Sequence, residues 1–530
     1  MSHPSTEPAR PASPTRLTVI NALLLPLADP GPPGAAALPD WFVGWMTVGE
    51  DGLITGIGPG SPPSLPPESP GDHGSAPVVP GAVLDARGAM VAPGFVSAHS
   101  HIFTSGLRGV AHSQTLYPWV RANGEALLDA SAEDMYWYTL HGSLDFVTNG
   151  ITSAYNFTHS RVSWLYEPDT GYNRPARIHG TDHVTRQFDG TADSGIRVVN
   201  SFRLDDEAFT EAETIDTFAA MVAASADRTP AAQHLGASIM GAVQWSSHRR
   251  SAELEAQMMR DLGVSNQAHF VETAEGIEFQ QSKFEWYEDA GALGRSFLFG
   301  HFVHPTDTMI ERAVAAGCAM VWQPTSNGRL GSGIADVTRL RDAGMRIGMG
   351  LDDQSCTDIS DPFQNMRIGM YTMRAKHSDA GIMTPREVLR MHTLGSAEVL
   401  GVEHRVGSLE VGKHADFLLV DPRSPDTGPV WDVYATYVMA CGLRNLQQVY
   451  IGGELASTRG VAESSLAADA SAELHARIVH RARAAGLALD YVPEADPEEA
   501  AIAARTADTT ASARAAAASS SSTAALSAAP

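Results

Sequence analysis

The sequence predicts an α/β protein, namely a (β/α)8 TIM-like barrel with a small β-sandwich domain built from both chain ends. From about residue 95 to residue 400, short apolar runs alternate with helical patterns, which is typical of a barrel of parallel strands. Strand-like runs separated by turns lie on both sides of this region, so the two chain ends are expected to share one β-domain. On pattern alone, a doubly wound open sheet is the alternative.

Composition divides the 530 residues into parts with different expected roles. The first residues are rich in Pro, Ser and Thr, and residues 511–530 are almost wholly Ala and Ser. The segment 58–80 is crowded with Pro, Gly and Ser and is expected to be a long loop. The predicted parts are a disordered leader (1–15), a composite β-sandwich domain (16–92 and 401–460), the barrel (93–400), a C-terminal helical extension (461–495) and a disordered Ala/Ser tail (496–530).

The barrel elements are expected at regular positions along the chain. The first strand is the apolar run 91–101, and later strands are expected at 152–155, 197–201, 267–271, 297–300, 319–323 and 346–350. Helices are expected between them at 251–262, 308–316 and 337–343. A further helix should begin after Thr384, because Pro385 and Glu387 complete a capping box.

The chain is acidic, since 37 Lys and Arg against 61 Asp and Glu give a net charge of −24. This charge argues against nucleic acid or an anionic membrane as a partner. The cysteines Cys318, Cys356 and Cys441 lie far apart and form no C-x-x-C pair, as expected in a reducing cytoplasm. No apolar run approaches the roughly eighteen residues of a membrane span, and the N-terminus lacks the apolar core of a signal peptide. We therefore expect a soluble cytoplasmic protein that acts on a small molecule.

The most informative run ends in His99-Ser100-His101. Alternate side chains of a strand lie on the same face, so both imidazoles could bind one metal ion. Three later strand ends carry further polar groups, which are His269 with Glu272, His301 with His304, and Asp352 after two glycines. Three histidines and Asp352 make a plausible ligand set that leaves a position for water.

These groups also suggest a reaction. A divalent cation can bring the pKa of bound water down to about 7, which makes hydroxide available at neutral pH. Asp352 is expected to take the proton of this water, Glu272 to pass a proton to a leaving nitrogen, and His301 to stabilise the developing oxyanion. A single polar residue at a strand end is weak evidence, whereas the ordered set of four indicates metal-dependent hydrolysis.

At these residues the chain resembles a known family. The run Pro93-Gly94-Phe95-Val96-Ser97-Ala98-His99-Ser100-His101 is similar to the Pro-Gly-hydrophobic-His-x-His motif of the amidohydrolase superfamily. Within it, the resemblance is to the branch of triazine hydrolases, cytosine deaminases and adenosylhomocysteine deaminase-like enzymes, and it spans roughly residues 17–455. Further matching positions are 107–109, Trp119, 324–327 and 407–417.

The resemblance implies one divalent metal ion, usually zinc (Zn2+), bound by His99, His101, His269 and Asp352. Co2+, Mn2+ or Fe2+ would suit these ligands as well. It also implies that Glu272 and His301 act around the bound water. No Lys stands near 239–245, where the binuclear branches carry a carboxylated lysine, which favours a single metal. The family further suggests a homo-oligomer, a dimer or higher.

Some segments depart from the deaminase pattern. The stretch 241–247 lacks the substrate-binding His of deaminases and contains Trp245 instead, and the last motif continues as Asp352-Asp353-Gln354. The segment 156–190 is long and rich in His, Tyr and Arg, so it could form a substrate lid or merely a decorated loop. These departures resemble hydrolases that cleave thiocarbamate or phenylurea C–N bonds in herbicides. The residues expected to contact the substrate are Arg108, Trp119, Trp245, His304, Asn327, Asp353 and Gln354.

The sequence thus predicts a metal-dependent amidohydrolase that cleaves a non-peptide C–N bond in an aromatic or apolar small molecule. The bond would belong to an amide, urea or carbamate, with a role in xenobiotic degradation. Two alternatives are an aminohydrolase that deaminates a nitrogen heterocycle and a hydrolytic dechlorinase of a triazine. A metal-binding scaffold without activity would be expected to lack one of Glu272, His301 or Asp352, and all three are present.

Overall fold

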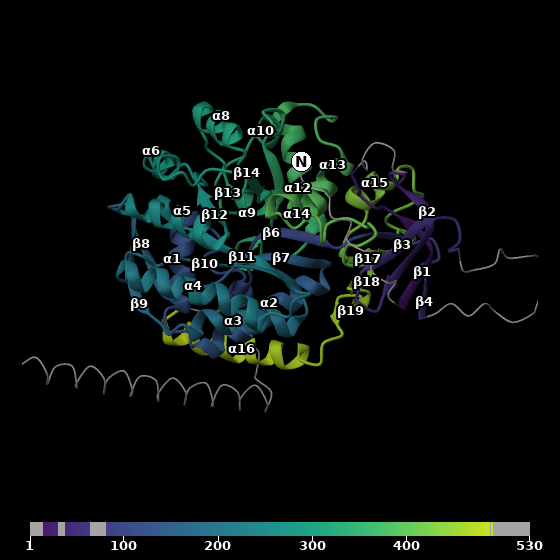
Figure 1. Cartoon of the computed structure of the whole chain (residues 1–530), viewed down its shortest axis with the longest axis horizontal. Coiled ribbons are helices and arrows are strands. Elements are labelled where there is room, and N and C mark those ends of the chain that lie inside the picture. The colour runs from purple at the N-terminus through teal and green to yellow at the C-terminus, as the bar shows by residue number, and fades with distance from the viewer. Residues whose placement is uncertain (1–13, 30–37, 64–80, 488, 491–530) are drawn as a thin grey trace, which may run out of the picture.

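The computed structural model describes residues 14–29, 38–63, 81–487 and 489–490 (Figure 1). Figure 1 shows a barrel surrounded by helices, with a second sheet beside it at the right of the view. The predicted Ala/Ser tail and nearly all of the predicted leader lie outside the described residues, as does most of the 58–80 segment. Among the described residues, no helix is both long and apolar enough to cross a membrane.

Eight parallel strands form the barrel wall, and a ninth strand of two residues closes it. The neighbouring order is β15-β14-β13-β12-β11-β10-β7-β6-β16, and β16 pairs with β6 beside Ser100 and His101. Since β16 follows β15 by two residues, the two ends of the sheet meet, which confirms the predicted barrel. The strands are β6 (Phe95–His101), β7 (Ile151–Phe157), β10 (Arg197–Phe202), β11 (His234–Gly241), β12 (Ser265–Phe270), β13 (Phe297–His301), β14 (Ala319–Trp322), β15 (Arg346–Met349) and β16 (Asp352–Asp353).

The barrel strands form where the sequence offers runs that can be buried on both faces. All residues of β7, β10 and β13 are buried, as expected of parallel strands between a barrel interior and a layer of helices. The sequence pattern does not predict β11, because His234, Gly236 and Ser238 interrupt its apolar run.

Helices cover the outside of the barrel. The predicted capping box is present, since the Thr384 side chain accepts from the backbone N–H of Glu387, whose side chain accepts from the N–H of Thr384. The α-helices are α1 (Leu116–Leu127), α2 (Ala132–Thr148), α3 (Asp182–Ser194), α4 (Glu211–Arg228), α5 (Arg250–Leu262), α6 (Ile277–Ser282), α7 (Phe284–Asp289), α8 (Asp307–Ala316), α9 (Pro324–Arg329), α10 (Val337–Asp342), α11 (Gln354–Thr357), α12 (Pro362–His377), α13 (Pro385–Arg390), α14 (Ser396–Leu400), α15 (Val433–Ala435) and α16 (Ala467–Ala484). Further helical turns of other types are η1 (Ile102–Leu107), η2 (Val243–Trp245), η3 (Met391–Gly395), η4 (Thr436–Ala440) and η5 (Leu443–Asn445).

The second sheet is built from both chain ends, as predicted. Its nine strands hydrogen-bond as one sheet, and β5 from the first part pairs with β17 from the last part. Its strands are β1 (Thr15–Leu24), β2 (Phe42–Gly49), β3 (Ile54–Pro59), β4 (Ala82–Asp85), β5 (Met90–Pro93), β17 (Phe417–Val420), β18 (Leu446–Ile451), β19 (Glu454–Thr458) and β20 (Val461–Ala462).

The Pro-Gly motif joins the two sheets. β5 ends at Pro93, Gly94 donates its N–H to the Asp416 carbonyl at 3.0 Å, and β6 begins at Phe95. A Cβ at Gly94 would lie 2.1 Å from Oγ1 of Thr152, so only glycine fits this crossing. The strand that carries the two histidines is therefore held at its start by the second sheet.

A hairpin and a C-terminal helix are added to the barrel and the second sheet. The hairpin of β8 (Val162–Glu167) and β9 (Tyr172–Ile178) forms its own two-stranded sheet. The helix α16 follows the last strand and packs on α2, where Arg477 and Arg481 pair with the buried Asp134.

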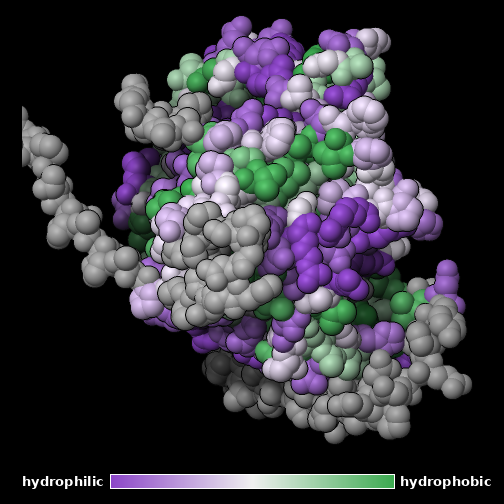
Figure 2. Space-filling model, turned by 90° about the vertical axis from the view of Figure 1, so that its right-hand side faces the viewer, coloured by the Kyte–Doolittle hydropathy of each residue, from purple (hydrophilic) through white to green (hydrophobic). Residues whose placement is uncertain are grey.

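Figure 2 looks onto the side of the molecule that carries the second sheet, where a hydrophobic area lies in the upper half among hydrophilic side chains. Some apolar side chains are largely exposed, such as Val43 at 59% and Trp431 at 92%. Single exposed apolar residues are ordinary on protein surfaces. The expected homo-oligomer therefore stays a prediction.

Candidate metal centre and active site

The four expected metal ligands meet at the carboxyl ends of three barrel strands, although β12 is separated from β6 by three other strands. His99 and His101 stand at the end of β6, His269 near the end of β12 and Asp352 in β16. One ligand atom from each lies within 4.8 Å of the others. Nε2 of His101 is 3.0 Å from Nε2 of His269, and Nε2 of His99 is 3.3 Å from Oδ1 of Asp352.

The protonation of these groups fits a cation between them. Burial lowers the pKa of His101 to about 3 and that of His269 well below its ordinary value, so both rings are neutral. Nδ1 of His99 lies 2.5 Å from Oε1 of Gln267, whose own Nε2 donates to the Ala98 carbonyl. Gln267 therefore holds the proton of His99 on Nδ1, and the lone pair of the buried Nε2, which has no hydrogen-bond partner among the described residues, faces the other ligands. Lone pairs directed at one point suit a divalent cation.

Asp352 links this group to other side chains. Burial alone would raise its pKa, but the neighbouring His301 and His99 lower it well below the ordinary value, so it is a carboxylate. Its Oδ2 accepts from Oγ of Ser326 at 2.5 Å. Two other groups with similarly close ligand atoms share Asp352, namely Glu272 with His301, and Asp353 with Cys356.

Glu272 and His301 stand beside the ligands and face each other. Nε2 of His301 lies 3.5 Å from Oε2 of Glu272 and 3.7 Å from Oδ2 of Asp352. Burial and the charge of Asp352 raise the pKa of Glu272 well above its ordinary value, so it holds a proton near neutral pH. Nδ2 of Asn327 donates to Nδ1 of His301 at 2.9 Å, so the ring proton of the neutral His301 lies on Nε2. The site thus offers one carboxylate and two proton donors.

A pocket with a volume of about 200 Å³ opens onto these groups. Its wall is largely aromatic, with Tyr117, Trp119, Trp164, Tyr166 and Trp245. The rings of Tyr117 and Tyr166 stack at 3.8 Å between centroids. Among the described residues that line the pocket, the charged or titratable side chains all belong to the metal-site cluster or are tyrosines.

Comparison with known proteins decides the family. Residues 90–456, which is more than half of the chain, match the amidohydrolase family. This chain belongs to the amidohydrolase family. As an amidohydrolase it is a metal-dependent hydrolase that acts on carbon–nitrogen bonds, as predicted from its motifs.

Several relatives of this amidohydrolase are deaminases by name. A 5-methylthioadenosine/S-adenosylhomocysteine deaminase of Desulforudis audaxviator is 26% identical over 452 residues, which is 83% of this chain and 93% of the relative. The enzyme of the same name from Symbiobacterium thermophilum is 29% identical over 382 residues, which is 69% of this chain and 80% of the relative.

Solved structures share the fold of the amidohydrolase. An adenosine deaminase from Xanthomonas campestris with bound zinc has a TM-score of 0.72 at 21% identity, covering 89% of this chain and 100% of that one. Atrazine chlorohydrolase from Arthrobacter aurescens TC1, complexed with zinc, has a TM-score of 0.69 at 17% identity, covering 87% and 100%.

The structure separates the expected substrate contacts into two sets. Trp119, Trp245 and Asp353 line the pocket of the amidohydrolase. Four others lie outside that lining. Arg108 pairs with Asp145 at 2.6 Å, Gln354 donates to Asp145 at 2.7 Å, His304 contacts the Ser332 carbonyl at 2.6 Å, and Asn327 holds His301.

Sequence reasoning missed Tyr117, Trp164, Tyr166 and Asn173, which line the pocket. Three of them belong to the β8–β9 hairpin within the segment 156–190, so part of that segment forms a pocket wall. Its histidines do not line the pocket. His159 and His183 contact each other at 2.9 Å, and the rings of His179 and His183 stack. The signal that could have identified the wall is the alternation of Trp164 and Tyr166, which places both on one face of a strand.

Proposed function

We propose that this amidohydrolase uses one zinc ion to hydrolyse an amide, urea or carbamate C–N bond in an aromatic small molecule. The observation that carries the proposal is the composition of the pocket wall, where five aromatic side chains surround the opening onto the metal-site residues. Flat aromatic groups stack favourably on such side chains, and apolar pockets with few polar groups suit uncharged ligands.

The side chains around the bond have complementary roles. A divalent cation held by His99, His101, His269 and Asp352 would lower the pKa of water and so supply the nucleophile. The Asp352 carboxylate accepts the proton that this water loses. Glu272, which holds a proton, passes it to the departing nitrogen, so an amine leaves rather than its anion. The Nε2–H of His301 donates to the oxygen on which negative charge develops.

Deamination of a nitrogen heterocycle is the second candidate, because the relatives described above are named deaminases. Against it, the loop 241–247 contains no His that could contact a ring nitrogen, and Trp245 occupies the pocket wall there. Among the residues that the structure describes, the lining also offers no additional charged group for the amino acid portion of S-adenosylhomocysteine. We therefore rank the amide, urea or carbamate reaction first.

A panel of substrates tests the proposal. The zinc-loaded protein would be incubated with an anilide, an N-aryl-N′,N′-dimethylurea, an aryl thiocarbamate, 5′-methylthioadenosine and a chloro-triazine. Aromatic amine, ammonia and chloride would be measured in parallel. We expect amine release from at least one aryl substrate, with kcat/KM at least tenfold above that for the nucleoside. Ammonia release from the nucleoside without any amine release would instead assign the chain to the deaminases.

A further inference from the structure

Trp164 reaches the active-site pocket from a segment that the barrel ladder does not hold. It lies on β8, which within the described part of the chain pairs with β9 alone, in a separate two-stranded sheet. The backbone hydrogen bonds of the barrel therefore cannot fix its position. Its place in the pocket wall therefore depends on side-chain contacts, which include the stacking of Tyr166 on Tyr117 of α1 and the contacts at the base of the hairpin.

The base contact is made by Asp205, in the loop after β10. Nε1 of Trp164 donates to Oδ1 of Asp205 at 2.8 Å. Oγ of Ser160 lies 2.6 Å and 2.7 Å from the two oxygens of the same carboxylate, and it accepts from the N–H of Val162, the first residue of β8. Asp205 is buried with 4% of its surface exposed. One carboxylate thus holds both the start of the hairpin and the ring that faces the pocket.

Arg203 supports the same ring from the other side. Its guanidinium carbon lies 4.1 Å from the centroid of the Trp164 ring, a cation–π geometry. Nε of Arg203 is 3.9 Å from Oδ1 of Asp205. Nε is buried and has no hydrogen-bond partner among the described residues. The ring of Trp164 is therefore held at its N–H by the carboxylate and over its face by the cation.

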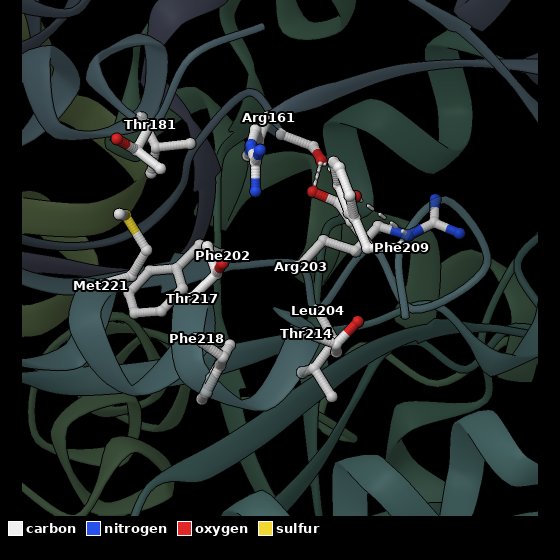
Figure 3. A pocket seen from close by; sticks show the side chains of 13 residues that line it. Arg161, Thr181, Phe202, Arg203, Leu204, Phe209, Thr214, Thr217, Phe218 and Met221 are labelled. Carbon is white, nitrogen blue, oxygen red and sulfur yellow. Dashed lines mark hydrogen bonds and ion pairs between the residues drawn. The ribbon is translucent and has the colours of Figure 1, made fainter. Parts of the chain in front are cut away.

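A small cavity lies directly behind this arrangement (Figure 3). Ser160, Arg203 and Asp205 are among its lining residues, whereas none of the metal-site residues is. In Figure 3 the guanidinium of Arg203 points away from Phe218 and Leu204, which form the lower part of the cavity. Its volume of about 20 Å³ suits about one water molecule, not a substrate. Trp164 itself is not among the lining residues, so the cavity lies behind the residues that hold the ring and not behind the ring.

The backbone at Asp205 is consistent with this role. Its φ is +58°, in the left-handed region, which is strained for a residue other than glycine. Asp tolerates this region better than most residues, but glycine would fit it without strain. The side chain at this position therefore has a function that glycine could not supply.

We propose that Asp205 is a positioning residue that holds Trp164 over the active-site pocket and thereby determines which aromatic groups fit. The inference rests on the proposed function only in naming the aromatic group as part of the substrate. With Asp205 in place, Trp164 forms a fixed wall for a flat ring. Without it, the hairpin base is free to move and the ring-binding part of the pocket widens. Loss of Asp205 should therefore weaken binding of the substrate and leave the positions of the metal-site residues unchanged.

A double-mutant cycle tests the link between the two residues. The variants are Asp205→Ala, Trp164→Ala and the double variant, assayed with the aryl substrate that the panel identifies and with its counterpart in which methyl replaces the aryl ring. We expect D205A to raise KM for the aryl substrate about tenfold and to change kcat less than threefold. In the W164A background, D205A should change KM less than twofold. If D205A raised KM about tenfold in the W164A background as well, the proposal would be overturned.

Conservative variants keep the test valid if D205A folds poorly. Asp205→Asn retains an oxygen that can accept from Trp164, so its KM should rise by no more than about threefold. Thr214→Val is the matched control, because Thr214 lines the same cavity and its buried hydroxyl has no partner among the described residues. We expect T214V to behave like the wild type. A KM increase in T214V equal to that of D205A would mean a general effect of the cavity and would contradict the proposal.

Hydrogen exchange measures the same link without any substrate. In D205A, amides of β8 should exchange at least threefold faster, with a smaller increase in D205N, while those of β10 and β12 keep the wild-type rate. Unchanged exchange of β8 in both variants would overturn the proposal. Because this measurement needs no turnover, it remains decisive even if the substrate panel assigns the chain to the deaminases.

Discussion

Glu272 is the residue whose replacement should separate metal binding from turnover. It is buried beside the metal ligands, but it is not one of the four that converge, and its pKa is raised so that it holds a proton. In Glu272→Gln the metal content should stay at the wild-type level, while kcat falls by about 10²–10⁴, as expected when general acid–base catalysis is lost. Elemental analysis and steady-state kinetics check both parts.

The exposed Glu275 on the same loop supplies the control. Glu275→Gln should keep kcat within about twofold of the wild type, because its side chain is not among those that line the pocket. If E272Q retained near-normal turnover, the assigned role of Glu272 would be wrong.

In the aromatic wall, the hydrogen bonds of Tyr117 show in which direction its phenolic O–H points. Its oxygen accepts from Nε2 of Gln280 at 3.1 Å, and this amide nitrogen also donates to the Glu275 carbonyl at 2.8 Å, which fixes the orientation of the amide. Burial raises the pKa of Tyr117 above its ordinary value, so the phenol keeps its proton. The O–H of Tyr117 therefore points away from Gln280.

We predict that Tyr117→Phe raises KM for a substrate with a carbonyl or thiocarbonyl acceptor by about fivefold to tenfold, the cost of one hydrogen bond. The change in kcat should be smaller than twofold. Tyr371→Phe, at a surface tyrosine that is 43% exposed, is the control. Equal KM values for Y117F and the wild type would show that Tyr117 contributes shape alone.

At the scale of elements, the barrel strands show which features the sequence could predict. His99, His101, His269 and Asp352 were all expected at strand ends, because apolar runs that end in metal-binding residue types are unambiguous. The contacts of His304 and Gln354 could not be predicted, since a side chain just beyond the end of a strand can point to either side. The alternation of Trp164 and Tyr166 indicates a strand face, but the placement of the hairpin against the pocket could not be predicted, because it depends on contacts with residues distant in sequence such as Asp205.

Lys283, between α6 and α7, ties these helices to the loop that carries the pocket residue Trp245. Its Nζ donates to the Ser246 carbonyl at 2.8 Å, directly after Trp245, and lies 3.5 Å from the ring centroid of Trp286. Only 2% of the residue is exposed. Burial lowers the pKa of Lys283 to about 8, although the charge of Glu207 opposes this shift.

The lowered pKa of Lys283 makes the free energy of unfolding depend on pH. Between about pH 8 and the ordinary lysine value of 10.5, the folded protein has lost this proton and the unfolded chain still binds it. The contribution of Lys283 to the free energy of unfolding therefore increases as pH rises through this window. In Lys283→Met this contribution is absent, so the wild type should gain about 1–2 kcal/mol relative to K283M between pH 7.5 and pH 10. Urea unfolding at both pH values measures the difference, and parallel curves for the two proteins would contradict the prediction.

At the scale of the whole molecule, a buried ion pair joins the barrel to the second sheet. Arg197 on β10 binds Asp416 through two contacts, Nε to Oδ2 at 2.6 Å and Nη2 to Oδ1 at 2.8 Å. Both side chains are almost fully buried, with 3% and 4% exposed. Removal of one partner leaves the other charge buried without compensation.

Arg197→Met should therefore lower the free energy of unfolding by about 3–5 kcal/mol, measured by urea unfolding. Arg339→Ala, which breaks the exposed pair with Asp307, is the control and should cost less than about 1 kcal/mol. The folded fraction of R197M should keep its metal content, because the pair does not contact the ligands. A loss in R197M no larger than that in R339A would mean that the pair does not stabilise the junction.

We expect one divalent cation among His99, His101, His269 and Asp352 at the end of the aromatic pocket. The most direct test is the metal content of the purified protein, determined by elemental analysis after removal of loosely bound ions. We predict one metal ion per chain, predominantly zinc, whose removal by a chelator abolishes turnover and whose return restores it. Two ions per chain would indicate that Asp353 and Cys356 complete a second site around Asp352, and a metal-free protein with full turnover would contradict the claim altogether.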